Sequence, residues 1–350
     1  MRRLPVYFLI DVSESMAGEP IEYVQDGMAS IIRELRKDPY ALETVWVSVI
    51  AFAGQPKTLT PLQEVASFYP PKFPIGSGTS LSNGLGHLMY ELRKNLEPTT
   101  CEQKGDWKPI VFLFTDGVPT DKPSDLQAAI AEWKKNWQRK ANLVAISFGD
   151  NTDSRVLGEL TSNVLLFKNA DAESYKAFFK WVTSSIQTSS KAVERNPDGI
   201  ELAASDGDAI SKIDLSKAGA KPADADPFIV LLGKCQQTKQ AYLVKYKKHV
   251  FEDDRGDIGM NYRLVGAYKI NDTYFELADE QSVSLKVSTE KLAGFPPCPC
   301  CGNPYGVAFD GSCGKIHCVG TEKMSTCPWC GGKAQYSSGG DNIDINRTQG

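Results

Sequence analysis

The sequence predicts an α/β fold: a doubly wound, mostly parallel, Rossmann-like sheet in the first half, followed by a small β-rich domain. Three observations predict it. Apolar strand-like runs alternate with helix-like runs through residues 1–190, which is typical of a parallel sheet with both faces covered. Oxygen-bearing side chains follow two of the strand runs, at the edge where such sheets bind ligands. Seven of the nine cysteines fall between residues 298 and 330.

The elements of the first half follow from hydrophobic periodicity. Pro20 suits a first helical turn, and Ser124 after Pro123 suits a helix start. Strands are expected at 6–10, 45–53, 110–114, 141–148 and 164–167, and helices at 20–37, 81–96, 124–139 and 172–189.

The second half changes composition. Residues 191–226 are rich in Ala, Asp, Gly, Ser and Pro, which predicts a linker between a domain at 1–190 and a β-rich domain at 227–335. Residues 336–350 are rich in Gly, Ser, Asn and Asp, and we expect a disordered tail. Within the β-rich domain, strands are expected at 228–232, 241–246, 262–268 and 274–277, with a hairpin turn at Asn271-Asp272.

A set of oxygen side chains marks a candidate cation site. Asp11-x-Ser13-x-Ser15 follows the first strand, Thr79 opens a helix, and Asp116 follows the strand at 110–114. Carboxylates and hydroxyls are hard oxygen ligands, which suit a small divalent cation better than zinc or copper. Taken alone, the Asp-x-Ser-x-Ser pattern could instead serve turns and helix caps.

The order and context of these residues resemble the metal-ion-dependent adhesion site of von Willebrand factor A domains. The segment at 115–121, Thr-Asp-Gly-x-Pro-Thr-Asp, is also typical of that family. The resemblance implies that Ser13, Ser15 and Thr79 bind Mg²⁺ (or Mn²⁺) directly, while Asp11 and Asp116 act largely through water or hydrogen bonds. An ion held by neutral ligands favours a carboxylate or phosphate from a partner, so the resemblance implies a docking site.

The cysteine cluster predicts zinc. Cys298-x-x-Cys301-Gly and Cys327-x-x-Cys330-Gly are two knuckle motifs, in which the glycine lets the backbone turn around a bound thiolate. We expect Cys298, Cys301, Cys327 and Cys330 to form a closed, structural Cys₄ site. Disulfides are the alternative, but the chain lacks a secretion signal and a small fold needs the metal.

The number of zinc ions stays open at one or two. A treble-clef arrangement, in which Cys313 and Cys318 join one knuckle, is also open. Cys101 and Cys235 are expected to be ordinary thiols, and His87 and His249 to have structural or surface roles. Further candidate zinc ligands are Cys300, Cys313, His317 and Cys318.

Composition narrows the partners and the location. The net charge is −4, and residues 291–350 carry five basic against four acidic residues, so nucleic-acid binding is unfavoured. No apolar stretch approaches the length of a membrane span. The apolar start of the chain meets Asp11 without a small-residue cleavage site, so we interpret it as a strand of a cytoplasmic protein.

The combination of both regions resembles the TerY-like proteins of bacterial tellurium-resistance systems. That resemblance implies a role in stress response beside a protein kinase and a metal-dependent Ser/Thr phosphatase. We expect a non-enzymatic adaptor that captures an acidic or phosphorylated protein segment. Two alternatives are a Mg²⁺-dependent phosphoryl-transfer or hydrolytic enzyme using Asp11 as nucleophile, and nucleic-acid binding through the zinc domain. The position two residues after Asp11 is a serine, which disfavours an aspartyl-phosphate enzyme.

Overall fold

The computed structural model falls into two compact units, which are described separately. The first contains Met1–Val12, Glu19–Phe73 and Thr79–Lys221, and the second contains Ser13–Gly18, Pro74–Gly78 and Pro222–Gly350. Within them the structure describes residues 2–148, 154–167, 172–192, 200, 202–203, 210–213, 227–252, 258–278, 285–322, 324–336 and 342–348.

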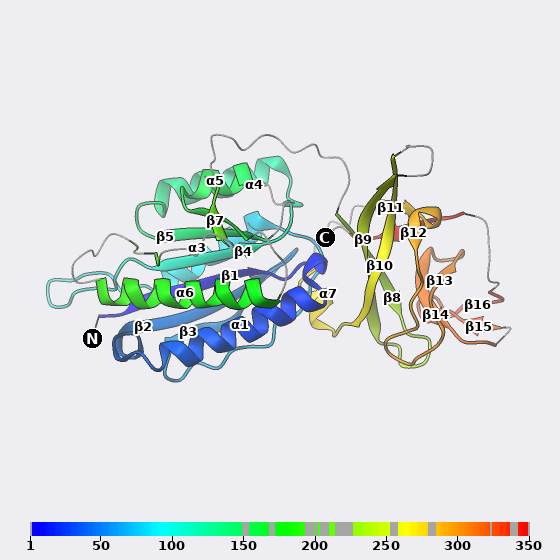
Figure 1. The fold of residues 1–350 in the computed structure, drawn as a ribbon, viewed down its shortest axis with the longest axis horizontal. Coiled ribbons are helices and arrows are strands. Elements are labelled where there is room, and N and C mark those ends of the chain that lie inside the picture. Colours follow the sequence, from blue (N-terminus) through cyan, green and yellow to red (C-terminus); the bar gives the residue numbers. More distant parts are fainter. Residues whose placement is uncertain are drawn as a thin grey trace. The chain divides into compact units, whose positions relative to one another are not determined.

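The first unit is built on a seven-stranded sheet in the order β3-β2-β1-β4-β5-β6-β7 (Figure 1). Its inner strands are parallel, and the two edge strands β3 and β7 are antiparallel to their neighbours. The central strand β1 is buried along its whole length, as its uninterrupted apolar run requires. The strands are β1 Leu4–Asp11, β2 Val45–Phe52, β3 Pro56–Glu64, β4 Ile110–Thr115, β5 Asn142–Phe148, β6 Val164–Phe167 and β7 Ile210–Lys212.

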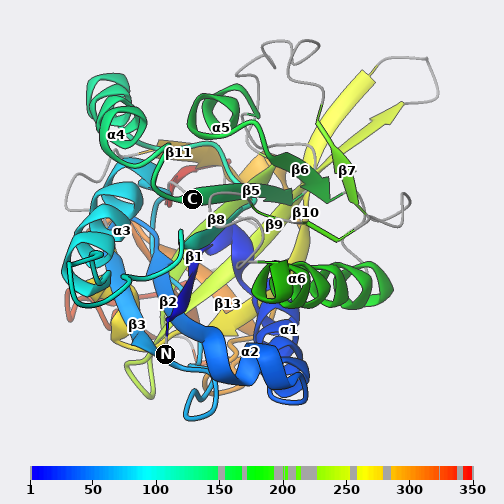
Figure 2. The ribbon, with the colours of Figure 1, turned by 90° about the vertical axis from the view of Figure 1, so that its left-hand side faces the viewer.

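Helices cover both faces of this sheet. Figures 1 and 2 show α1 and α6 side by side along one face, and α3, α4 and α5 at the other. Aromatic rings fill the space between the sheet and α6, where Phe114 of β4 meets Phe178 of α6 edge-on. On the other face, Leu85 of α3 and Trp133 of α4 belong to the hydrophobic core. The helices are α1 Glu19–Leu35, α2 Pro39–Thr44, α3 Leu81–Asn95, α4 Pro123–Asn136, α5 Ser154–Leu160 and α6 Ala172–Ala192. In the described part of the chain, no helix combines the length and apolarity that a membrane crossing requires.

Periodicity missed four elements of the first unit, β3, β7, α2 and α5. The edge strand β3 contains two prolines and alternating polar residues, so it lacks the apolar run of a buried strand. The strand β7 lies inside the segment 191–226 that was expected as a linker, where it pairs with β6; the remainder of that segment lies largely outside the described residues. The helices α2 and α5 were missed because each spans only six or seven residues.

The second unit contains a six-stranded sheet in the order β12-β10-β9-β8-β14-β13. Its long strands β9 and β10 form an antiparallel pair, and β14 joins β8 in parallel. Two small two-stranded sheets, β11 with β17 and β15 with β16, complete it. The strands are β8 Phe228–Lys234, β9 Ala241–Glu252, β10 Ile258–Lys269, β11 Leu285–Ser288, β12 Leu292–Ala293, β13 Tyr305–Asp310, β14 Lys315–Val319, β15 Ser325–Thr326, β16 Lys333–Ala334 and β17 Asp344–Arg347.

Two expectations for the second half are wrong. Residues 274–277, expected as a strand after a hairpin turn, lie instead in or directly after the short helix α7 (Thr273–Glu276), which Asp272 precedes. The expected disordered tail contains β17, whose Ile345 is fully buried in the core of this unit. One apolar residue among polar ones is enough to anchor β17 to β11, and composition alone does not show it.

Candidate metal centres

Asp11 and Asp116 stand at the ends of two neighbouring parallel strands. Asp11 is the last residue of β1 and is fully buried. Ile10 lies opposite Phe114 of β4, so Asp116 follows the adjacent strand end. The Thr115 hydroxyl donates a hydrogen bond of 2.8 Å to Asp11 Oδ2. Both carboxylates therefore lie at the carboxyl edge of the sheet, where ligands bind in this fold class.

Thr79 reaches the same edge of the first unit. A Cβ added to Gly117, the neighbour of Asp116, would lie 3.5 Å from Thr79 Oγ1. The backbones of Thr79 and Thr120 are joined, since Thr120 N donates to Thr79 O at 2.9 Å and Thr79 N donates to Thr120 Oγ1 at 2.9 Å. The loop that carries Thr79 is thus fixed to the loop that follows Asp116.

The Asp121 carboxylate fixes the start of helix α3 directly after Thr79. It accepts hydrogen bonds from Ser80 Oγ at 2.6 Å, Leu81 N at 2.8 Å and Ser82 Oγ at 2.5 Å. It thereby satisfies donors that a helix start leaves without partners. Asp121 is the last residue of the Thr-Asp-Gly-x-Pro-Thr-Asp segment, from which no role for it was expected. The sequence feature that indicates this helix-start role is an acidic residue shortly after the Thr-Asp-Gly segment at the end of β4.

Ser13 precedes the short 3-10 turn Glu14–Met16 that follows β1, and Ser15 lies within it. Both are buried, and their hydroxyl oxygens are 2.9 Å apart. Adjacent oxygen ligands of an octahedral Mg²⁺ ion, with bonds of about 2.0–2.1 Å, are also about 2.9 Å apart. The spacing of the two hydroxyls thus fits one edge of a magnesium coordination shell. The Asp11 carboxylate precedes this pair by two residues in the sequence, and it too is a hard oxygen ligand.

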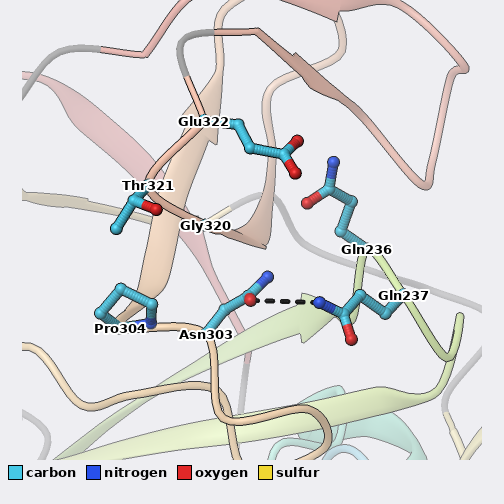
Figure 3. A pocket seen from close by; sticks show the side chains of 7 residues that line it. All are labelled: Gln236, Gln237, Asn303, Pro304, Gly320, Thr321 and Glu322. Atoms are coloured by element: carbon cyan, nitrogen blue, oxygen red, sulfur yellow. Dashed lines mark hydrogen bonds between the residues drawn. The ribbon is translucent and has the colours of Figure 1, made fainter.

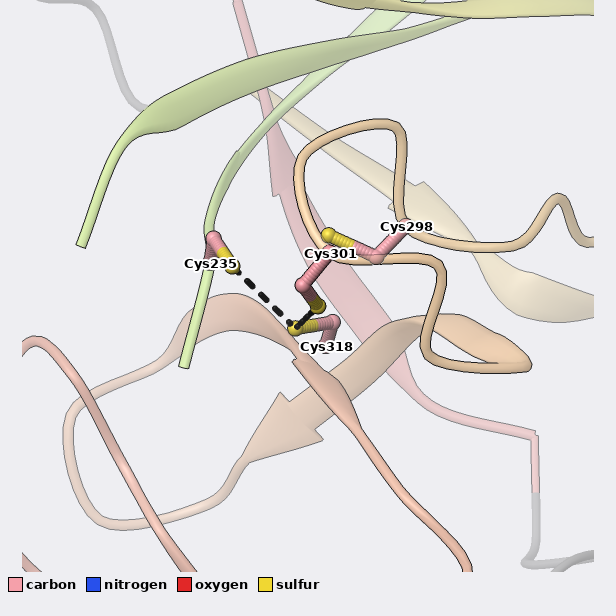
Figure 4. Close-up of side chains that lie close together, drawn as sticks. All are labelled: Cys235, Cys298, Cys301 and Cys318. Atoms are coloured by element: carbon pink, nitrogen blue, oxygen red, sulfur yellow. Dashed lines mark hydrogen bonds between the residues drawn. The ribbon is translucent and has the colours of Figure 1, made fainter. Parts of the chain in front are cut away.

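Four cysteines of the second unit converge in the first thiolate cluster. Cys235 follows β8, Cys298 and Cys301 belong to one knuckle, and Cys318 lies on β14; the thiols point toward one another (Figure 4). Their ligand atoms all lie within 4.8 Å of one another, with Cys301 Sγ 3.7 Å and Cys235 Sγ 4.0 Å from Cys318 Sγ. Tetrahedral zinc with bonds of about 2.3 Å places its sulfur ligands about 3.8 Å apart.

Asp310, Cys313, Cys327 and Cys330 form the second cluster, also within 4.8 Å. Cys313 Sγ lies 3.8 Å from Cys327 Sγ, and Cys330 Sγ lies 3.3 Å from Asp310 Oδ2. Three thiolates and a carboxylate are ligands that zinc accepts. The two clusters provide for one or two zinc ions, and none of the nine cysteines, all of them described, forms a disulfide.

The candidate ligands Cys298, Cys301, Cys327 and Cys330 do not come together in one Cys₄ site, and the structure shows a pairing that the sequence left open. The structure separates the two knuckles, so that Cys298 and Cys301 lie in one cluster and Cys327 and Cys330 in the other. Of the further candidates, Cys318 belongs to the first cluster and Cys313 to the second. The pairing depends on which strands meet, and knuckle spacing alone does not reveal it.

His317 and Cys300 belong to neither cluster. The buried His317 ring uses both nitrogens elsewhere: Nδ1 donates to Cys318 O at 2.9 Å and Nε2 lies 2.7 Å from the Tyr336 hydroxyl. A backbone carbonyl can only accept, so Nδ1 carries the proton. Burial lowers the pKa of His317 and raises the pKa of Cys300 to about 11, so both stay neutral near pH 7.

Sequence reasoning missed Cys235 and Asp310 as members of the clusters. Asp310-x-x-Cys313-Gly314 has the same spacing as the knuckles, with Asp in the first place. Its turn is the same too, because Gly314 N donates to Asp310 O as Gly331 N donates to Cys327 O. This repeated pattern could have been found in the sequence. Cys235 had no comparable signal, because its place depends on the pairing of β8 with β14.

The second unit contains a polar pocket of about 340 Å³, whose lining side chains are shown in Figure 3, and it adjoins Cys318 of the first cluster. Two of its residues also contact the cluster: Gln236 N donates to Cys318 Sγ at 3.2 Å, and Asn303 Nδ2 lies 3.6 Å from the same sulfur. Such N–H contacts stabilise a metal-bound thiolate. The pocket is lined by Gln236, Gln237, Asn303, Pro304, Gly320, Thr321 and Glu322.

Two protein-family models together match most of the chain. The model described as von Willebrand factor type A domain matches residues 6–181, and the model described as TerY-C metal binding domain matches residues 224–350. Both agree with the observed α/β sheet and the cysteine-bearing β-rich unit, and the predicted fold class is confirmed.

Individual relatives are distant. Inter-alpha-trypsin inhibitor heavy chain H1 of Bos taurus is 23% identical over 154 residues, which is 43% of this chain and 17% of that protein, so the chain spans less than a fifth of that relative. Proximal thread matrix protein 1 of the mussel byssus, in a structure described as having a zinc-occupied MIDAS motif, is 16% identical with a TM-score of 0.39, over 54% of this chain and 46% of that one. A von Willebrand factor type A protein from Catenulispora acidiphila is 12% identical with a TM-score of 0.40, over 79% and 68%.

Proposed function

Because the chain belongs to the von Willebrand factor type A domain family and also carries a TerY-C metal-binding domain, we propose that it is a non-enzymatic, metal-dependent adaptor. Mg²⁺ or Mn²⁺ would be held by Asp11, Ser13, Ser15, Thr79 and Asp116. The ion would capture a carboxylate or phosphate of a protein partner. The β-rich unit would hold one or two structural zinc ions and present a second interaction surface.

The observation that carries this proposal is the Ser13–Ser15 hydroxyl pair at 2.9 Å, directly after the buried Asp11. Neutral direct ligands do not cancel the charge of a divalent ion, which therefore keeps its affinity for an anionic group. Asp11 accepts a hydrogen bond from Thr115 and would act as an anchor of this arrangement.

The biological setting proposed here comes from the TerY-C match and from the resemblance to TerY-like proteins. We propose a bacterial stress-response or tellurite-resistance system in the cytoplasm, with a protein kinase and a metal-dependent Ser/Thr phosphatase as candidate partners. The polar pocket beside the first thiolate cluster is a candidate for the second interaction surface, because its amide groups and the Glu322 carboxylate offer hydrogen-bond donors and acceptors.

Cation binding can be tested with Mn²⁺ and its effect on water relaxation. Wild-type protein should bind Mn²⁺ and enhance the proton relaxation of water, and an acidic or phosphoserine peptide should reduce that enhancement by replacing bound water. Ser13→Ala should lose the binding, whereas Ser124→Ala, at an exposed position of α4, should keep it. Equal Mn²⁺ binding by both variants would refute the proposed site.

A further inference from the structure

The loop Ser13–Gly18 belongs by its contacts to the second compact unit, as does the segment Pro74–Gly78. Ala17 is fully packed into a hydrophobic cluster with Val230, Leu243 and Tyr274, which come from β8, β9 and α7. The loop that carries two of the five proposed cation ligands is thus an integral part of the second unit. Its geometry depends on the side chains that hold it there.

Lys245 of β9 binds the backbone of this loop. Only 2% of this lysine is exposed, and its Nζ lies 4.5 Å from the centre of the Phe228 ring. The ammonium donates hydrogen bonds to Ser15 O and, at 3.1 Å, to Ala17 O. A buried ammonium is costly unless it finds acceptors, and here two acceptors come from the candidate cation loop.

Tyr274 of α7 binds the side chain between the two serines. Glu14 is fully buried, and its Oε1 accepts a hydrogen bond of 2.5 Å from the Tyr274 hydroxyl. Its other oxygen lies 3.4 Å from Gly78 N, on the second segment that this unit includes. Tyr274 itself is 2% exposed, so this contact is shielded from water.

The end of the loop is equally constrained. Gly18 adopts a φ of +91°, which side-chain-bearing residues rarely adopt. A Cβ at this position would lie 2.5 Å from the Tyr268 hydroxyl of β10. The chain therefore turns out of the loop against an aromatic side chain, and a larger residue would require both an unfavourable backbone conformation and a shift of Tyr268.

We propose that Lys245 and Tyr274 are positioning residues for the divalent-cation site. They hold the carbonyls of Ser15 and Ala17 and the carboxylate of Glu14, so that the Ser13 and Ser15 hydroxyls keep their spacing before the ion binds. This inference rests on the proposed function of the Ser13–Ser15 loop as a cation site. Its consequence is that residues of β9 and α7, far along the chain, set the cation affinity of the Ser13–Ser15 loop within the second unit.

The test measures Mn²⁺ affinity of the full-length, zinc-loaded protein by electron paramagnetic resonance of free Mn²⁺. Lys245→Met keeps the side-chain length and removes the charge, and Lys247→Met is its exposed control on the same strand. Tyr274→Phe removes only a hydroxyl. Its control is Tyr246→Phe, because Tyr246 has a buried hydroxyl with no partner among the described residues.

We expect Lys245→Met and Tyr274→Phe to weaken Mn²⁺ binding by about tenfold or more, since hydrogen bonds to charged groups contribute on that scale. Both controls should bind as wild type. Zinc content by elemental analysis should be unchanged, which separates positioning from general loss of structure. If Lys245→Met loses its zinc, the milder Tyr274→Phe variant decides the question.

A Ser13→Ala arm separates the two ways of failing. If Ser13→Ala binds Mn²⁺ as tightly as wild type, the proposed cation site itself is wrong. If Ser13→Ala abolishes binding while Lys245→Met and Tyr274→Phe bind as wild type with full zinc content, the cation site stands and the positioning role is overturned.

Discussion

Individual side chains that need not touch the cation determine how well the strand-end site is formed. Thr115 orients Asp11, Thr120 joins the Thr79 loop, and Asp121 receives the donors at the start of α3. Each of these contacts bridges segments more than 35 residues apart in the chain. They turn a short polar motif into a fixed arrangement of oxygen atoms.

Replacing Asp121 by alanine should destabilise the first unit and weaken cation binding. Losing helix-start contacts of this kind costs about 1–2 kcal/mol of unfolding free energy. Thr79 would lose its support at the same time, so Mn²⁺ affinity should fall together with the urea midpoint. The adjacent exposed Lys122→Ala serves as control. If Asp121→Ala had the stability and the Mn²⁺ affinity of wild type, the Asp121 carboxylate would stabilise neither the start of α3 nor the position of Thr79.

His87 of α3 makes the stability of the first unit depend on pH. Its Nε2 lies 2.7 Å from Thr58 Oγ1, and burial lowers its pKa from the usual 6.5. Below about pH 6.5 the unfolded chain therefore binds a proton that the folded protein does not, and the free energy of unfolding falls as the pH falls.

Urea unfolding at pH 7.5 and pH 5.5 measures this effect. His87→Gln should show a smaller loss of stability between the two pH values than wild type. An identical loss in the two proteins would mean that His87 does not titrate differently on folding.

At this scale, the sequence predicted the five candidate cation ligands because they lie in short motifs at strand ends. Among the supporting residues, Asp121 lies in a recognisable motif, but Glu14 was beyond sequence reasoning. Glu14 looks like an ordinary exposed acid between two serines, yet it is fully buried against Tyr274, 260 residues later. No local pattern indicates such a contact.

Among the elements, the metal-binding turns share one construction. In both Cys-x-x-Cys-Gly knuckles the glycine N donates to the carbonyl of the first cysteine at 2.9 Å, and its φ is near +78°. Asp310-x-x-Cys313-Gly314 repeats the turn with a φ of +70°. Each turn presents two ligands on one side of the chain. The turns that begin at Asp310 and Cys327 together supply the carboxylate and three thiols of the second cluster.

Gly331→Ala should test the turn without disturbing any neighbour. Nothing lies within 4 Å of the position that a Cβ would take, so the cost is that of the left-handed backbone, about 1–2 kcal/mol. Gly311→Ala is a matched control, because Gly311 also has open space but no positive φ. The midpoint temperature of thermal unfolding of the zinc-loaded protein should fall for Gly331→Ala and stay unchanged for Gly311→Ala. Equal midpoints for the two variants would contradict this role of Gly331.

Zinc content tests the two clusters directly. We expect two zinc ions per chain in wild type, and about one after Cys235→Ser or Asp310→Ala, because each removes a ligand from a different cluster. Cys300→Ser should retain both, since Cys300 belongs to neither cluster. A single zinc in wild type, or loss of zinc from Cys300→Ser, would contradict this assignment.

The prediction of helices and strands succeeded where hydrophobic patterning alone determined the element. Buried strands such as β1 and β4 carry continuous apolar runs, and the long helices carry a clear period. It failed where pairing rather than composition forms the element, as for the edge strand β3, for β7 and for β17. The sequence left the cysteine pairing open for the same reason, since the first cluster depends on the parallel contact of β14 with β8.

For the whole molecule, the sequence predicted two kinds of structure in the right order, and the family models agree with both. It did not predict that the contacts of Ser13–Gly18 assign this loop to the second unit. Chain order placed the loop with the first sheet, whereas burial of Ala17, Glu14 and Lys245 places it with β8 and β9.

The proposed function requires that a divalent cation on the Ser13–Ser15 loop captures a protein partner. The most direct measurement is affinity capture from native lysate with wild-type, Ser13→Ala and Ser124→Ala protein in Mg²⁺, compared by quantitative mass spectrometry. We predict a partner that is retained by wild type and by Ser124→Ala and lost with Ser13→Ala at unchanged zinc content. Identical partners in all three samples would contradict the claim and would assign binding to the zinc-bearing unit instead.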